Sequence, residues 1–101
     1  MGPVSNPDEF CAALSTYVGA GLGVGAGRVR SEFPEHAPVL LAEIDALLQA
    51  SRNLPGLWGH EALPLDDACD RIDRFVEVEY PFVPAALRRR FVNAMSYELW
   101  K

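Results

Sequence analysis

The chain has 101 residues, half of them hydrophobic, and 14 acidic residues against 9 basic ones give it a formal net charge of −5. This length and composition predict one folded domain, residues 1–101, and exclude an intrinsically disordered chain. The acidic balance argues against a nucleic-acid binder, because contacts to phosphates require clustered Lys and Arg. It fits a soluble monomer, or a protein partner that is itself basic.

The first predicted helix covers residues 7–18. Asn6 is a suitable N-cap, Pro7 fits the first helical position, and acidic residues follow in the first turn. Apolar residues then recur at helical spacing. They predict one buried stripe, formed by Phe10, Leu14, Tyr17 and Val18.

Glycine occupies every second position of the segment GAGLGVGAG, residues 19–27. The segment partly matches the G-x-G-x-x-A pattern of dinucleotide-binding folds, but that pattern functions after a strand, and here a helix precedes it. Its small-xxx-small spacing suits a membrane helix, yet the segment is too weakly hydrophobic to predict one. Because each glycine weakens a helix by about 1 kcal/mol, we expect the first helix to end near Gly19 to Gly21. The run then forms a joint that is either flexible or closely packed.

Three more helices are predicted by apolar spacing, over residues 38–51, 65–80 and 84–100. A connector rich in Pro and Gly separates the helix over 38–51 from the helix over 65–80. Val/Glu alternation in RFVEVEYPFV would also suit a strand, but the helical period that continues through it favours a helix. We therefore predict an all-α fold, a compact bundle or orthogonal array of about four helices.

Four carboxylates follow one face of the predicted helix 65–80, opposite its apolar face. They are Asp66, Asp70, Asp73 and Glu77, at spacings of 4, 3 and 4. Like charges at these spacings destabilise a helix, and we expect ion pairs of Asp67 with Arg71, and of Asp70 with Arg74, to relieve part of this. Exposure to solvent explains why the face is polar, but not why it is so uniformly acidic. The pattern indicates docking of a basic protein surface, with Trp58 as an apolar anchor.

No residue pattern typical of catalysis or metal binding is present. His36 and His60 have no second His or Cys at ligand spacing. Cys11 and Cys69 form no Cys-x-x-Cys motif, and we expect them to be buried, reduced thiols. The sequence therefore predicts neither an enzyme, a metal site nor a cofactor.

The segments LLAEIDALLQ and DDACDRIDRFVEVEYP, residues 40–49 and 66–81, resemble segments of small bacterial immunity proteins. These include the immunity proteins of contact-dependent growth inhibition systems, which are similar in size, acidity and helical content. The resemblance implies a protein that neutralises a toxin, often a basic nuclease, by covering it in the producing cell. It carries over no functional residue.

We therefore expect a cytoplasmic binding protein that neutralises a basic toxin or nuclease domain, as an immunity protein, antitoxin or phage-type inhibitor does. Neither nucleic acid nor a membrane is an expected partner. Two alternatives stay open. One is a self-associating module, a homodimer, that packs the glycine run and aromatic residues near the C-terminus against a second copy. The other is a small ligand-binding domain that uses Trp58, His60 and Glu61.

Overall fold

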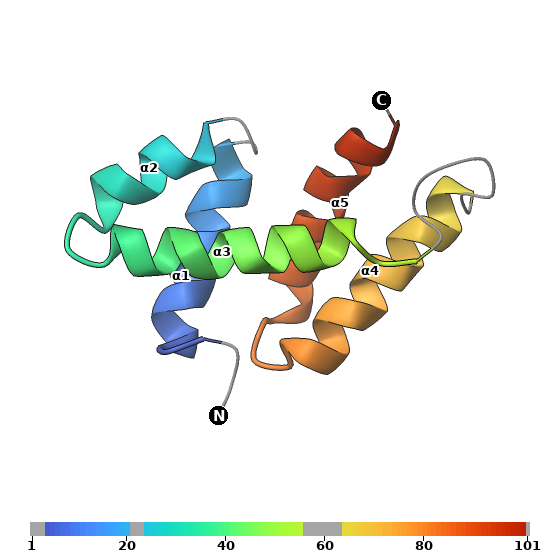
Figure 1. Ribbon diagram of the computed structural model, residues 1–101, viewed down its shortest axis with the longest axis horizontal. Coiled ribbons are helices and arrows are strands. Elements are labelled where there is room, and N and C mark those ends of the chain that lie inside the picture. Colours follow the sequence, from blue (N-terminus) through green and yellow to red (C-terminus); the bar gives the residue numbers. More distant parts are fainter. Residues whose placement is uncertain (1–3, 21–23, 56–63, 101) are drawn as a thin grey trace. The chain divides into compact units, whose positions relative to one another are not determined.

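The computed structural model describes residues 4–20, 24–55 and 64–100 (Figure 1). Five helices and no strand occur in these ranges, so the all-α prediction is confirmed and the expected number of about four is too low. The helices are α1 Pro7–Ala20, α2 Gly25–Glu32, α3 Ala37–Arg52, α4 Leu65–Glu79 and α5 Ala85–Trp100. None of them reaches the length and hydrophobicity that a membrane-spanning helix requires, in the part of the chain that the structure describes.

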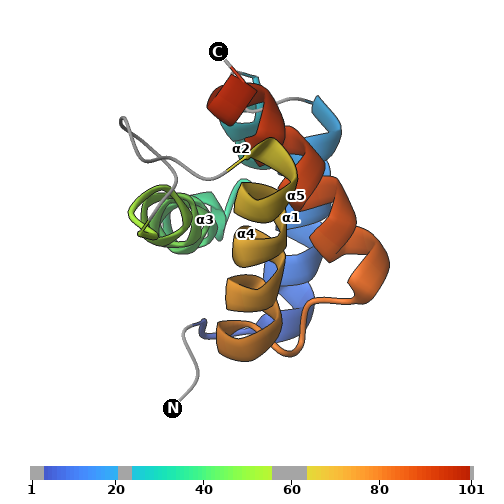
Figure 2. The same ribbon diagram turned by 90° about the vertical axis from the view of Figure 1, so that its right-hand side faces the viewer.

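The chain divides into two units, residues 1–47 and 48–101. In the first unit α1 packs against α2, and in the second α4 packs against α5. Figures 1 and 2 both show α4 and α5 side by side as they leave the turn that joins them. Each unit is therefore built around one pair of consecutive helices, while a single domain over 1–101 stays a prediction.

The start of α1 follows the predicted capping pattern. The side chain of Asn6 accepts a hydrogen bond from the backbone N–H of Glu9 at 3.1 Å, as an N-cap residue does. Phe10 and Leu14 of the predicted stripe are fully buried, whereas Tyr17 and Val18 are half-buried. The segment before α1 is fixed to α3, because the N–H and the hydroxyl of Ser5 both donate to Oε2 of Glu43, at 2.8 and 3.1 Å.

The additional helix, α2, begins inside the glycine run. α1 ends at Ala20, which confirms the expected end of the first helix, and residues 21–23 lie outside the described ranges. Gly25 is buried, and a Cβ added to it would lie 2.5 Å from the carbonyl oxygen of Tyr17 and 2.9 Å from its Cα. Only glycine permits this approach of two backbones. The joint is thus closely packed at Gly25, whereas an added Cβ at Gly27 would meet no atom within 4 Å.

One face of α4 is buried within the second unit, where α4 packs against α5. Ala68, Ile72 and Val76 are buried, as the apolar spacing predicts, and α4 continues to Glu79, which excludes the strand alternative for most of that segment. Tyr80 closes the helix and is 6% exposed. Its ring lies 6.3 Å from that of Phe75 and 5.9 Å from that of Phe82, between centroids. The turn into α5 is therefore packed by aromatic contacts. The apolar spacing of α5 predicts a core stripe of Leu87, Phe91, Ala94, Met95 and Leu99. Leu87, Phe91 and Met95 are buried and Ala94 is half-buried, while the side chain of Leu99 lies outside the described part.

Candidate protein-binding face

The four carboxylates predicted as a binding surface lie on the solvent side of α4, and we refer to them as the acidic face. Asp66, Asp70 and Glu77 are exposed, and Asp73 is half-buried. The helical spacing that buries Ala68, Ile72 and Val76 forces these residues outward, since they occupy the opposite arc of the same helix. The sequence prediction that they share one face agrees with the helix that the structure contains.

Arg88 of α5 forms ion pairs with one half of the acidic face and not with the other. Nε of Arg88 donates to Oδ1 of Asp73 at 2.8 Å, and its Nη2 lies 3.6 Å from Oε2 of Glu77. The Arg88 side chain is only 17% exposed, so solvent screens these pairs less than it screens a surface pair. The carboxyl-terminal half of the acidic face, Asp73 and Glu77, is therefore already paired with a cation of the same chain.

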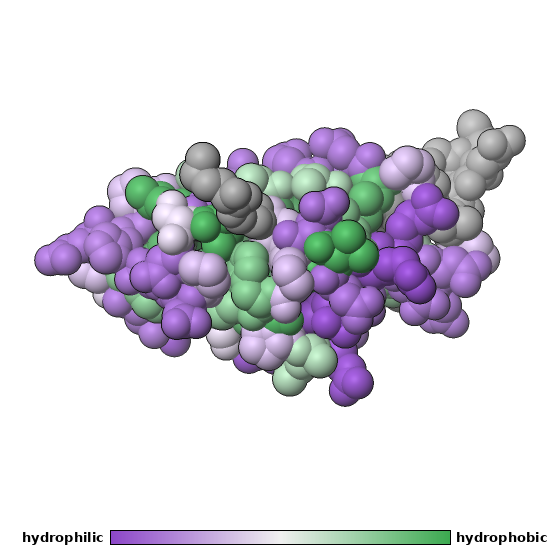
Figure 3. Space-filling view, turned by 90° about the horizontal axis from the view of Figure 1, so that it is seen from below, coloured by the Kyte–Doolittle hydropathy of each residue, from purple (hydrophilic) through white to green (hydrophobic). Residues whose placement is uncertain are grey.

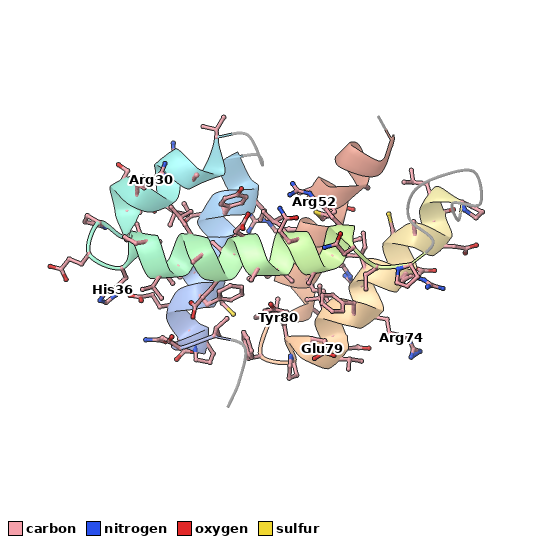
Figure 4. All side chains as sticks on the ribbon, in the orientation of Figure 1. Arg30, His36, Arg52, Arg74, Glu79 and Tyr80 are labelled. Atoms are coloured by element: carbon pink, nitrogen blue, oxygen red, sulfur yellow. The ribbon has the colours of Figure 1, made fainter. Side chains whose placement is uncertain are left out.

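The expected ion pairs within α4 are wrong. Asp67 does not pair with Arg71, because Nη1 of Arg71 instead donates to the carbonyl oxygen of Pro55 at 3.0 Å. Arg74 forms no ion pair with Asp70, and its side chain points away from the helix (Figure 4). In the part of the chain that the structure describes, Asp66, Asp67 and Asp70 have no ion-pair partner. Uncompensated negative charge is thus concentrated in the amino-terminal half of α4.

Two hollows flank α4. The first, which we call the α4 groove, is an open hollow of about 550 Å³ between α4 and the segment after α3. It is lined by the apolar side chains Leu54, Pro55 and Phe75 and by the charged residues Asp67, Asp70, Arg71 and Arg74. The second is a hollow of about 330 Å³ between α4 and α5, lined in part by Cys69, Asp73 and Arg89. Asp70 borders both hollows and is the only residue of the acidic face at the α4 groove among the described residues.

Apart from Asp70, the residues that line the α4 groove are not among those predicted to bind a partner. Asp67, Arg71, Arg74 and Phe75 are spaced by 4, 3 and 1, so they share one side of α4, beside the acidic face. Their shared side of α4 could be predicted from this spacing. The opposing wall at Leu54 and Pro55 could not be predicted, because the connector has no regular apolar pattern. Trp58, proposed as an apolar anchor, lies outside the described ranges, as do His60 and Glu61.

The two cysteines both have raised pKa values. Neither forms a disulfide with the other, and both are half-buried, less buried than expected. Burial raises the pKa of Cys11, with a further contribution from the charge of Asp8. Burial also raises the pKa of Cys69, with contributions from Asp66 and Asp70. A raised pKa lowers the thiolate fraction at neutral pH, and the thiolate is the nucleophile.

His36 lies at the corner before α3 and pairs with the first turn of α1. Its Nδ1 is 2.8 Å from both carboxylate oxygens of Glu9. The hydrogen bond and the negative charge of Glu9 raise the pKa of His36, and its side chain is exposed. Among the residues within 4–20, 24–55 and 64–100, no group of three His, Cys, Asp or Glu side chains gathers as metal ligands would.

Three comparisons with known proteins bear on identity. No protein-family model, curated protein or solved structure matches the chain. The features of α4 that bear on function are the acidic face, its pairing with Arg88 and the groove beside it.

Proposed function

We propose that this chain is a non-catalytic binding module that docks a basic protein through α4. The observation that carries the proposal is the uneven pairing of the acidic face. Asp66 and Asp70 are exposed and have no cationic partner among the described residues, whereas Arg88 pairs with Asp73 and Glu77. Neighbouring carboxylates on a helix repel each other, and a cationic partner surface relieves this repulsion.

The chemistry of such a partner suits a toxin or nuclease domain. A protein that acts on nucleic acid needs a basic surface to hold phosphates, and an acidic inhibitor can cover that surface. The proposed role is therefore that of an immunity protein, antitoxin or phage-type inhibitor acting in the cytoplasm. The net charge of −5 supports long-range attraction to such a partner.

Self-association through the glycine run has less support. Gly25 is already occupied by Tyr17 of the same chain, so this glycine is not free to contact a second copy. Among the described residues, the exposed large hydrophobic side chains come from several segments: Val24, Val39, Leu65 and Val78. On the face that Figure 3 displays, hydrophobic residues are interspersed with hydrophilic ones.

Charge reversal in α4 tests the proposal. Asp66→Lys combined with Asp70→Lys is compared with Glu35→Lys combined with Asp45→Lys, which makes the same change in net charge at exposed positions outside α4. The probe is a fluorescently labelled peptide of alternating arginine and serine, and its affinity is measured by anisotropy at low and at physiological ionic strength.

We expect the α4 variant to bind the peptide about tenfold more weakly, with a shallower salt dependence, because close charge pairs add to net-charge attraction. The control should lose only the smaller share that depends on net charge. Equal losses in the two variants would contradict the proposal. Circular dichroism checks that both variants keep the helical content of the unmodified chain.

A further inference from the structure

The α4 groove has an apolar floor that the fold leaves partly open. Leu54 and Phe75 are half-buried and Pro55 is exposed. Phe75 is held in place on one side by its contact with Tyr80. An apolar side chain of a partner that covered this floor would remove the remaining surface from water, at roughly 25 cal/mol per Å².

The wall of the groove is fixed by Arg71. Its guanidinium donates to the Pro55 carbonyl, sixteen residues earlier in the chain, and so ties the segment after α3 to α4. This bond also occupies one donor of Arg71 away from the carboxylates. Asp67 and Asp70 therefore keep their oxygens available at one end of the groove.

The charged residues of the groove are unevenly distributed along α4. Asp67 and Asp70 lie toward the amino end of α4, and Arg74 lies one turn later. Figure 4 shows Arg74 extending away from the helix, and among the described residues it forms no ion pair with either carboxylate. Arg71 also lines the groove, and its hydrogen bond holds it at the carbonyl of Pro55. A partner side chain with a positive end therefore fits at Asp67 and Asp70, and Arg74 opposes it from the other end.

We propose that the α4 groove receives a segment of the basic protein partner in which an arginine stands next to a large apolar side chain. This inference rests on the proposed function and specifies which part of α4 the partner contacts. The apolar side chain covers Leu54, Pro55 and Phe75, while the guanidinium pairs with Asp67 and Asp70. Arginine suits the site better than lysine, because its planar head forms two parallel bonds to a carboxylate and stacks on an aromatic ring.

An open hollow of this kind suits a protein segment better than a small molecule. Small-molecule sites enclose most of their ligand, whereas peptide segments lie in exposed grooves and insert single side chains. Apolar floor and unpaired carboxylates occur together in this groove, and this combination selects an amphipathic basic segment over a purely basic one.

Two labelled peptides of equal length and charge test the inference. One alternates arginine with leucine and the other alternates arginine with serine. We expect the unmodified chain to bind the arginine–leucine peptide about tenfold more tightly, which corresponds to about 1.4 kcal/mol. Leu54→Ser should abolish most of this preference and leave binding of the arginine–serine peptide nearly unchanged.

Adjacent reversals in the first turn of α4 provide a matched control. Asp66→Lys and Asp67→Lys change the same charge at two exposed neighbours, but only Asp67 lines the groove. Asp67→Lys should therefore weaken the arginine–leucine peptide several-fold more than Asp66→Lys does. Arg74→Glu should strengthen binding of the same peptide, a gain that damage to the fold would not produce.

The outcomes separate this inference from the proposed function. Equal affinity for both peptides, or equal effects of Asp66→Lys and Asp67→Lys, would overturn the groove as the contact site. If reversal at Asp66 and Asp70 still weakened both peptides relative to its control, the proposed function would stand without the groove. If no reversal in α4 weakened either peptide more than the control, both would fail.

Discussion

The two helix pairs of this protein are held together by opposite means. α1 and α2 meet where a side chain is missing, because Gly25 lets α2 approach the backbone of α1 at Tyr17. α4 and α5 meet with charged side chains, because Arg88 of α5 pairs with Asp73 and Glu77 of α4. The first contact buries Gly25 against the backbone of Tyr17, whereas the second neutralises half of an acidic face and leaves its other half exposed. For this reason the proposed binding surface is placed in the second unit.

The largest effect is expected at the glycine contact. Gly25→Ala would place a Cβ against backbone atoms of Tyr17, which cannot move aside as the end of a side chain can. We expect a loss of about 3 kcal/mol in the free energy of unfolding, measured by urea denaturation. Gly27→Ala, in open space on the same helix, should instead stabilise the protein by up to about 1 kcal/mol. Similar effects of the two changes would contradict the close approach.

The charged contact should contribute less. Arg88→Met should cost about 1–2 kcal/mol in the free energy of unfolding, because it breaks a partly buried pair and leaves Asp73 and Glu77 to repel each other. Arg89→Met is the control, since Arg89 is exposed and forms no ion pair among the described residues, and we expect a change within about 0.5 kcal/mol.

A double-mutant cycle isolates the pairing from lost packing of the arginine stem. The effect of Arg88→Met should shrink when Asp73→Asn and Glu77→Gln are already present. An undiminished effect would mean that Arg88 stabilises the helix pair without its charge.

The pair between His36 and Glu9 should add a small pH dependence to the first unit. The pKa of His36 is raised in the folded chain, so the stabilisation is complete below the ordinary pKa of His and is lost as pH rises through the raised value. Proton NMR titration of His36 should give a pKa above 6.5, and Glu9→Gln should lower it. An unchanged titration in Glu9→Gln would contradict the pair.

The smallest effect concerns the thiols. Because burial and nearby carboxylates raise the pKa of both Cys11 and Cys69, alkylation by iodoacetamide at neutral pH should be several-fold slower in the folded chain than in urea. Single Cys→Ser variants assign the two rates. A folded-state rate equal to that in urea would show that the thiols are not shielded.

Helical periodicity was sufficient to predict α1, α3, α4 and α5. It did not predict α2, because GAGRVRSE contains only one large apolar residue, the buried Val29. Its two glycines and its serine also have a lower helix propensity than alanine. The close contact at Gly25 depends on Tyr17, eight residues away across the joint, and spacing alone does not reveal which glycine is packed.

The acidic face was predicted correctly as a set of residues on one helix, but its charge balance was not. Local rules pair residues four apart, which led to the wrong partner for Arg71. The actual partners are fifteen or sixteen residues apart, at Arg88 with Asp73 and at Arg71 with Pro55, and depend on how the segments fold back on α4. Contacts of this range follow from packing rather than from sequence spacing.

We propose that a basic partner binds the unpaired half of the acidic face, Asp66 and Asp70, and not the half that Arg88 occupies. Two double variants, each of which removes two negative charges, are compared by anisotropy of the labelled arginine–leucine peptide. The first combines Asp66→Asn and Asp70→Asn, and the second combines Asp73→Asn and Glu77→Gln. We predict that the first variant binds about tenfold more weakly and the second changes about twofold or less. Equal losses in the two variants, or a larger loss in the second, would contradict the account.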